Sequence, residues 1–103
     1  MNVRRAAKTD GNHADVLKAL RDAGATAQSL HTVGQGCPDI LVGFRGINIL
    51  LEVKDGSLTS SRRELTADER EWHGTWGGQV AVAKTPEEAV CAVVEAAKRC
   101  GVL

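Results

Sequence analysis

The sequence predicts a small α/β (α+β) domain in which helices flank a mixed β-sheet, in the order α-β-β-β-α-β-α. Short apolar runs of strand length alternate with segments whose apolar residues have helical spacing. Capping and turn residues separate these segments. The chain has 103 residues, of which 43% are hydrophobic and 25% charged, so we expect a single domain over residues 1–103.

The first helix is expected to follow a polar N-terminal segment. Residues 1–11 are polar and are predicted to form a flexible basic arm. Asn12 can cap a helix with apolar residues at core spacing up to Leu20, and Gly24 is suited to end it. A short strand is expected within residues 25–33, ahead of a glycine-rich turn.

The second half of the chain predicts a helix, a strand and a final helix. Thr66 and Glu69 have the spacing of a capping box at the start of a helix that a Gly-Gly pair ends. Residues 79–83 are predicted to form a short buried strand. Thr85 as a cap and Pro86 at the first helical position open the last helix.

The overall composition excludes several kinds of protein. Thirteen Lys and Arg residues balance thirteen Asp and Glu residues, so any nucleic-acid binding must come from a local arrangement of charge. Three cysteines without a CxxC pair argue against a disulfide framework and a zinc knuckle. No apolar run approaches the roughly 20 residues that span a bilayer, and the N-terminus lacks a hydrophobic signal segment. We therefore expect a cytoplasmic protein without membrane contact.

Residues 36–56, GCPDILVGFRGINILLEVKDG, combine two apolar strands with charged residues at one end. An X-Gly pair between apolar runs is typical of a two-residue hairpin loop, here Arg45-Gly46. Counting back along both strands from this loop places Asp39 directly opposite Glu52. Side chains alternate along a strand, so Lys54 is expected on the same face as Glu52. The three charged groups should converge.

This constellation is suited to metal-dependent hydrolysis. Two close carboxylates repel each other unless a cation lies between them, and Mg²⁺ is a hard cation that prefers oxygen ligands. Asp39 and Glu52 would supply carboxylates, and the exposed strand end offers the backbone carbonyl of Val53 as a third ligand. A metal lowers the pKa of bound water and polarises a phosphoryl oxygen, while Lys54 would orient or deprotonate the water or neutralise phosphate charge. The favoured reaction is phosphodiester hydrolysis.

At these residues the chain resembles a known superfamily. Pro38-Asp39 followed by Glu52-Val53-Lys54 looks like the PD-(D/E)XK nuclease motif, and with the downstream helix and strand it resembles the stand-alone VRR-NUC domains, small nucleases often carried by phages. The similarity spans residues 12–97. It implies a restriction-endonuclease-like core and Mg²⁺-dependent cleavage of structured or branched DNA, with Mn²⁺ able to substitute. It also implies a homodimer able to resolve Holliday junctions, no small-molecule cofactor, and the host cytoplasm if the protein is phage-encoded.

The resemblance assigns roles residue by residue. Asp39 and Glu52 match the metal carboxylates, and Lys54 matches the catalytic lysine. Asp15 matches a position where the family usually has Glu as an additional active-site acid, although it also fits the first turn of a capped helix. Glu69 falls where relatives commonly have Gln, close to the site, and the capping box offers a second explanation for it.

Two groups of basic residues are candidates for DNA contact. Arg62 and Arg63 follow a serine-rich loop after the proposed site, and Arg4, Arg5 and Lys8 belong to the N-terminal arm. Both groups could hold phosphates without reading sequence. Each could equally be an ordinary solvated charge cluster.

Trp72 and Trp76 stand four residues apart, which places them on one face of the predicted helix. Large apolar residues at helical spacing usually pack in a core, so we expect these side chains to be buried. The neighbouring His73 is expected to serve packing or to lie at the surface.

Three functional hypotheses are compatible with these residues. The leading hypothesis is a metal-dependent endonuclease for branched or structured DNA that works as a homodimer, because two sites related by a two-fold axis could cut opposing strands. The alternative is a non-catalytic DNA-binding or assembly module that retains the nuclease fold. A weaker third hypothesis is a metal-dependent phosphodiesterase that acts on RNA or nucleotides.

Overall fold

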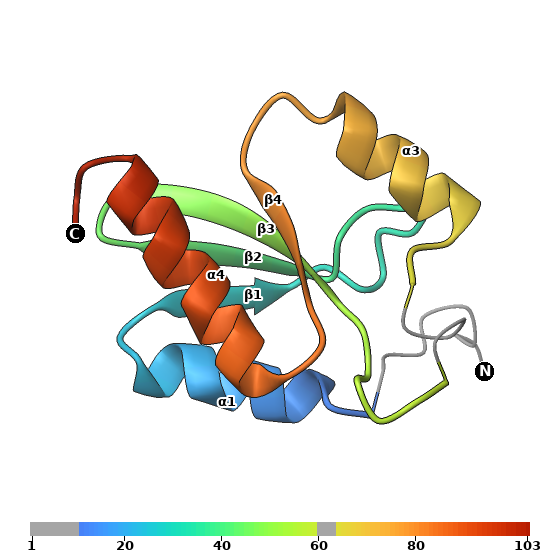
Figure 1. Cartoon of the computed structure of the whole chain (residues 1–103), viewed down its shortest axis with the longest axis horizontal. Helices are drawn as coiled ribbons and strands as arrows, with labels where there is room; N and C mark the ends of the chain where they lie inside the picture. Colours follow the sequence, from blue (N-terminus) through green and yellow to red (C-terminus); the bar gives the residue numbers. More distant parts are fainter. Residues whose placement is uncertain (1–10, 60–63) are drawn as a thin grey trace.

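The structure, a computed structural model, describes residues 11–59 and 64–103. The predicted order of elements is confirmed (Figure 1). The elements are α1 (His13–Asp22), β1 (Thr26–Ser29), β2 (Ile40–Phe44), β3 (Ile47–Val53), α3 (Ala67–Thr75), β4 (Val80–Ala83) and α4 (Pro86–Arg99). Apart from Gly11, the predicted N-terminal arm lies outside the described residues.

The four strands form one mixed sheet in the order β1-β2-β3-β4. The first three strands are antiparallel neighbours, and β4 pairs in parallel with β3 after a crossover through α3. The hairpin register is confirmed, because Phe44 pairs with Ile47. Arg45 and Gly46 have φ angles of 51° and 85°, as a two-residue turn with left-handed central residues requires.

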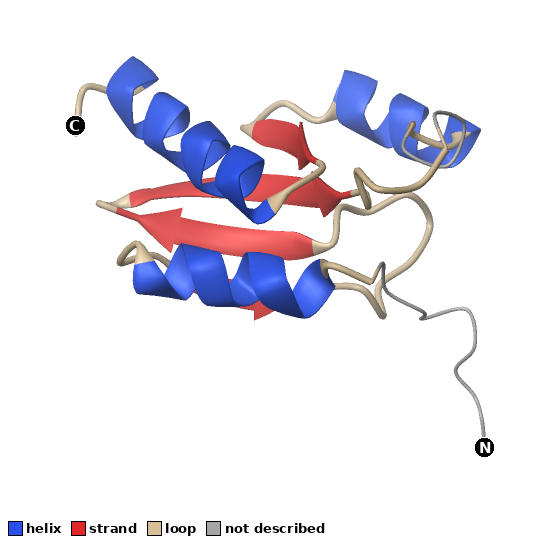
Figure 2. Ribbon diagram, turned by 60° about the horizontal axis from the view of Figure 1, so that its bottom comes forward, coloured by secondary structure: helices blue, strands red, loops and turns tan. Residues whose placement is uncertain are grey.

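Helices α1 and α4 lie side by side and cover one face of the sheet (Figures 1 and 2). Alternate residues of β2 and β3 point toward these helices, and the remaining residues point to the other face. The side chains that fill the space between helices and sheet are apolar and almost fully buried; they include Val16, Leu20, Ile40, Val42, Ile49, Leu51, Val53, Ala83, Ala89 and Val93. Glu52 and Lys54 therefore belong to the face that α1 and α4 leave open.

Strand β4 is a less buried strand than the sequence predicted. Of its four residues, Ala83 is buried and the other three are partly exposed. The reason is its place at the edge of the sheet, where only one strand neighbours it. In the described part of the chain, no helix has the length and apolar character that crossing a membrane requires.

The prediction that the Asn12 side chain caps α1 is wrong. Asn12 occupies the capping position, but its side chain accepts no capping hydrogen bond. Its Nδ2 instead donates to the backbone carbonyls of Lys54 at 3.2 Å and Lys84 at 3.1 Å. These carbonyls follow the parallel strands β3 and β4, so the amide joins the start of α1 to the ends of both strands.

Helix α3 lies beyond one end of the sheet, apart from α1 and α4 (Figure 1). Its predicted capping box is confirmed, because Thr66 Oγ1 accepts from the Glu69 N–H and Glu69 Oε1 accepts from the Thr66 N–H. The burial predicted for Trp72 and Trp76 is wrong. The two rings stack on each other with centroids 4.5 Å apart, and no residue of α3 is buried. A helix at the end of a sheet has no strand face on which to bury its aromatic residues.

Candidate active site

Asp39 lies next to Glu52 at the end of the β2–β3 hairpin. The ladder between the strands ends with the pair Ile40 and Leu51, one pair short of these two carboxylates. The Asp39 backbone N–H donates to the Leu51 carbonyl at 2.9 Å, and Asp39 Oδ2 accepts from the Val53 N–H at 2.7 Å. Asp39 is thus bound to the residues on both sides of Glu52, which brings the two predicted carboxylates together.

Glu52 is a buried carboxyl, with only 3% of its surface exposed. Burial raises its pKa to about 10, with contributions from the hydrogen bond and charge of Asp39 and from the charge of Glu69, while Lys54 opposes the shift. Its Oε1 is buried and has no hydrogen-bond partner among the described residues. An unsatisfied oxygen of this kind is expected where a cation or proton completes the site.

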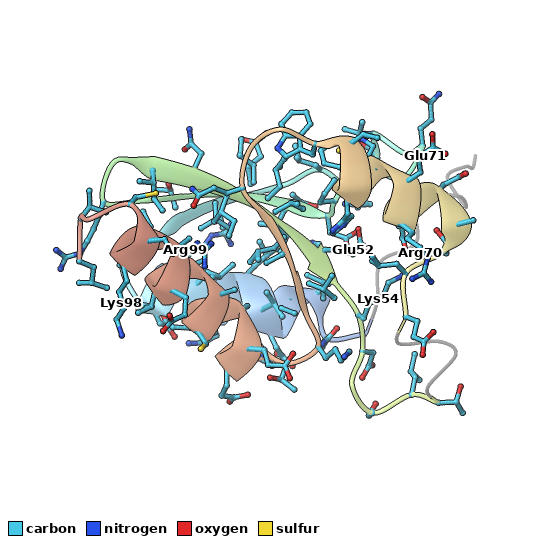
Figure 3. The ribbon with its side chains drawn as sticks, turned by 45° about the horizontal axis from the view of Figure 1, so that its top comes forward. Glu52, Lys54, Arg70, Glu71, Lys98 and Arg99 are labelled. Atoms are coloured by element: carbon cyan, nitrogen blue, oxygen red, sulfur yellow. The ribbon has the colours of Figure 1, made fainter. Side chains whose placement is uncertain are left out.

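Lys54 is buried beside these carboxylates, with 9% of its surface exposed. Its Nζ lies 2.8 Å from Glu69 Oε1 and 3.9 Å from Glu52 Oε2. Figure 3 shows Glu52 and Lys54 in the space between the end of β3 and α3. Lys54 is therefore paired closely with Glu69 on the helix and lies farther from the Glu52 carboxyl group on the sheet.

Glu69 joins α3 to the cluster through a single oxygen. Its Oε1 accepts the capping hydrogen bond from the Thr66 N–H at 2.8 Å and also contacts Lys54 Nζ. Partial burial raises the pKa of Glu69, but the hydrogen bonds from Lys54 and Thr66 outweigh it, so the net shift is downward. Glu69 is consequently held ionised, and both explanations given by the sequence, capping and proximity to the site, apply to it.

The donor set fits a hard divalent cation. Asp39 and Glu52 offer adjacent carboxylates, and the orphaned Glu52 Oε1 is free to bind a metal. Val53 lies beyond the last ladder pair of β2 and β3, and on its other side it pairs with Ala83 of β4. No group of three or more His, Cys, Asp or Glu side chains with metal-binding geometry occurs in residues 11–59 and 64–103. Mg²⁺ needs no such group, because one or two carboxylates and several waters can hold it.

The remaining predicted site residues are not brought into the cluster. Asp15 is exposed in the first turn of α1, and within the described part of the chain no hydrogen bond or ion pair joins it to the cluster. Its assignment as an active-site acid stays a prediction. The predicted DNA contacts lie outside the described residues; they are Arg4, Arg5, Lys8, Arg62 and Arg63.

Three residues near the cluster were missed by the sequence reasoning. Burial and the charges of Glu52 and Asp39 raise the pKa of the Cys37 thiol, which shows that this side chain lies close to both carboxylates. Burial lowers the pKa of His73, and its Nε2 is buried without a hydrogen-bond partner among the described residues. His73 follows Glu69 by one helical turn, and this spacing was a signal in the sequence.

Arg70 is the third missed residue. It follows Glu69 on α3, is exposed, and its Nη2 donates to the Leu65 carbonyl at 3.2 Å. Figure 3 draws it on the first turns of α3, the helix that also carries Glu69. An exposed guanidinium is a donor group suited to anions such as phosphate or carboxylate.

Comparisons of the chain with protein-family models, with curated proteins and with solved structures gave no match. What the chain does must therefore be inferred from the geometry of its own residues.

Proposed function

We propose that this protein is a metal-dependent deoxyribonuclease that hydrolyses phosphodiester bonds in structured or branched DNA. One observation carries the proposal: a buried carboxyl with an unsatisfied oxygen, Glu52, lies beside a second carboxyl, Asp39, and a buried lysine, Lys54. Groups of opposed charge with strongly shifted pKa values are typical of catalytic sites. The resemblance to the PD-(D/E)XK nucleases, and to VRR-NUC domains in particular, supports the same reaction.

Each residue of the cluster has a distinct role in this proposal. Asp39, Glu52 and the Val53 carbonyl would hold Mg²⁺, or Mn²⁺ in its place. When bound, such a metal lowers the pKa of a water molecule and polarises a phosphoryl oxygen. The Val53 N–H orients Asp39 through the hydrogen bond to Oδ2. Lys54 would orient the attacking water or neutralise the negative charge that develops on the phosphate.

Two arguments favour structured DNA as the substrate: the net charge of the chain and the symmetry of a dimer. The chain carries no net charge, so tight sequence-independent binding to long duplex DNA is not favoured. A homodimer would place two clusters around a two-fold axis, which suits a four-way junction with the same symmetry. We therefore include junction resolution by a homodimer in the proposal.

The test is a cleavage assay on labelled four-way junction, flap, single-stranded and linear duplex DNA with Mg²⁺, Mn²⁺ or EDTA. We expect cutting of a branched substrate with either metal and none in EDTA. Asp39→Asn and Lys54→Ala should each lower the rate at least 100-fold, as loss of a catalytic group typically does. Absence of cutting of all four DNAs with both metals, or full activity of Lys54→Ala, would show that the enzyme proposal is wrong.

One observation favours a second candidate, a non-catalytic DNA-binding or assembly module with the nuclease fold. Glu69 engages Lys54 at 2.8 Å, so the lysine is neutralised by a carboxylate other than a metal ligand. In that case DNA would bind without being cut, and Glu69→Gln would not produce cleavage. Parallel binding and cleavage assays of the parent chain and of Glu69→Gln separate the two candidates.

A further inference from the structure

A hollow lies on the side of α3 that faces the loop before β2. It has a volume of about 330 Å³, within the range of small-molecule sites, and is lined by Gln35, Asp68, Glu71, Trp72 and Thr75. The four helical residues among these recur at the spacing of one helix face. Glu69 and His73 occupy the adjacent face of the same helix, toward the catalytic cluster.

Trp72, which lines the hollow, is part of an aromatic stack. Trp72 and Trp76 are nearly parallel, with an interplanar angle of 19°, and 46% of Trp76 is exposed. Trp72 itself is half-buried, so its ring is only partly open to solvent. Planar rings stack readily on tryptophan, and nucleobases do so irrespective of sequence.

The polar side chains around the hollow determine which planar molecule can bind in it. Asp68 and Glu71 carry acceptor oxygens and negative charge, which repel phosphate and attract N–H donors. Thr75 Oγ1 already donates to backbone carbonyls of α3, so it also offers lone pairs. The bases with an exocyclic amino group, which are cytosine, adenine and guanine, match this rim better than thymine, whose only donor is its ring N3–H.

The loop before β2 lines the hollow through Gln35 and also reaches the proposed catalytic cluster. Gln35 has a φ of 58°, a left-handed conformation rare for a residue with a side chain, and it lines the hollow. Cys37, two residues later, lies close to Asp39 and Glu52. Asp68 lines the hollow, and the next residue, Glu69, lies 2.8 Å from Lys54 Nζ, so the hollow and the cluster can contact neighbouring nucleotides.

We propose that this hollow binds an unpaired base with an exocyclic amino group, cytosine, adenine or guanine, next to the phosphate that the cluster cleaves. The base would stack on Trp72, donate its amino group to Glu71 or Asp68, and contact the Gln35 amide. This inference rests on the proposed nuclease function, and it gives a physical reason for selecting branched DNA, because only a splayed strand presents a free base.

The test uses labelled forked duplexes whose unpaired arms are all cytosine or all thymine, with a blunt duplex as reference, in EDTA. The chain has two tryptophans and no tyrosine, so its intrinsic fluorescence reports on this stack. We expect the cytosine fork to quench the fluorescence and to bind several-fold more tightly than the thymine fork. Trp72→Ala should weaken fork binding about tenfold, and Trp72→Phe should restore most of it.

A matched pair of variants separates base recognition from general charge. Glu71→Ala should remove the preference for cytosine over thymine. Glu95→Ala, which removes one exposed carboxylate from α4, should leave that preference intact. Equal binding of the two forks by the parent chain, or unchanged binding by Trp72→Ala, would overturn the inference. A fluorescence change that follows protein concentration without DNA would also overturn it, because a second copy would then cover the stack.

Cleavage in Mg²⁺ is measured in parallel to distinguish this inference from the proposed function. Cutting without any dependence on the unpaired base overturns the base site and leaves the nuclease proposal standing. Fork binding with the expected preference but no cutting of any DNA supports the base site and rejects the nuclease proposal.

Discussion

Glu69 places one carboxylate oxygen between two donors, the Thr66 N–H and Lys54 Nζ, both at 2.8 Å. A charge-assisted contact of this length is stronger than a neutral hydrogen bond, and Lys54 is only 9% exposed, so solvent screens it little. The same lysine has to serve a phosphate in the proposed reaction. Glu69 therefore competes with the substrate for Lys54.

The first prediction concerns this competition. Glu69→Gln keeps an oxygen for the Thr66 cap but removes the charge that holds Lys54, so the affinity for substrate should rise about three- to tenfold, which corresponds to roughly 1 kcal/mol. The KM for branched DNA measures this effect. Glu88→Gln is the control, because Glu88 also accepts a backbone hydrogen bond near a helix start, at 2.8 Å from the Lys84 nitrogen. If both variants change KM equally, the effect is not specific to Lys54.

The second prediction follows from the pKa of Glu52. The folded chain holds this proton up to about pH 10, whereas the unfolded chain releases it near 4.5. The folded state therefore binds more protons in this interval, so its stability is greatest below about pH 4.5 and falls as the pH rises toward 10. A single proton contributes at most about 1.4 kcal/mol per pH unit. Metal competes with the proton, so Mg²⁺ should reduce the slope.

Urea unfolding at several pH values between 6 and 9, in EDTA and in Mg²⁺, measures this slope. Glu52→Gln should flatten the pH dependence in EDTA, because a neutral amide has no proton to release. If Glu52→Gln and the parent chain show the same slope, the pH dependence of stability comes from other titratable groups.

At the scale of elements, the site depends on how separate pieces of chain are joined. Strand β3 carries Glu52 and Lys54, α3 carries Glu69, and the start of α1 is bound to the strand ends through Asn12. The loop before β2 touches α3, because a Cβ built on Gly36 would lie 2.6 Å from the Asp68 carbonyl oxygen. These contacts hold the elements around the cluster.

The third prediction tests the Asn12 amide. Asn12→Ala removes two partly buried hydrogen bonds and should lower the free energy of unfolding by about 1–3 kcal/mol. Asn12→Ser supplies a good helix cap that is too short to reach the carbonyls of Lys54 and Lys84, so it should be destabilised to a similar degree. If Asn12→Ser is as stable as the parent chain, the prediction is wrong, because Asn12 then stabilises the fold by helix capping and not by its contacts with the strand ends. Denaturant unfolding measures both variants.

The fourth prediction concerns the contact between the loop and α3. Gly34 and Gly36 both have positive φ angles, of 77° and 82°, but Gly34 has open space where its Cβ would lie. Alanine at either position costs about 1 kcal/mol of backbone strain. Gly36→Ala must also displace α3, so it should lose more stability than Gly34→Ala and should lose most cleavage activity. Equal losses in the two variants would mean that the position of α3 does not matter for the site.

At the scale of the whole molecule, one sheet face is covered and the other is only partly so. Helices α1 and α4 bury one face, whereas on the other face Leu41 remains 39% exposed and a hollow of about 220 Å³ runs over β1, β2 and β3. The candidate cluster of Asp39, Glu52 and Lys54 lies on this second face, at the end near α3. Substrate can therefore approach it without displacing the core.

The fifth prediction is that the protein is a homodimer. Sedimentation equilibrium should give a mass of twice the chain mass of 10.9 kDa at micromolar concentration. With two clusters per particle, a four-way junction should be cut on opposing strands within one binding event. A single-chain mass at all concentrations, or nicks on one strand alone, would contradict the dimer.

Much of the fold could be predicted from the sequence because its signals are local. The X-Gly loop and the apolar alternation set the hairpin register, and Thr66 with Glu69 marked the start of α3. The same register brought Asp39, Glu52 and Lys54 into one candidate site. Capping, turns and alternation depend on residues a few positions apart, so they are visible without a three-dimensional structure.

The tertiary structure alone decided which distant residues meet. The ion pair of Lys54 with Glu69, the Asn12 contact with two strand ends and the incomplete burial of the two tryptophans all depend on where α1 and α3 lie relative to the sheet. Helical spacing shows which residues share a face but not what covers that face. By itself, the sequence therefore determined the elements and the carboxylate pair, whereas packing between elements decided the partner of the lysine and the hollow beside it.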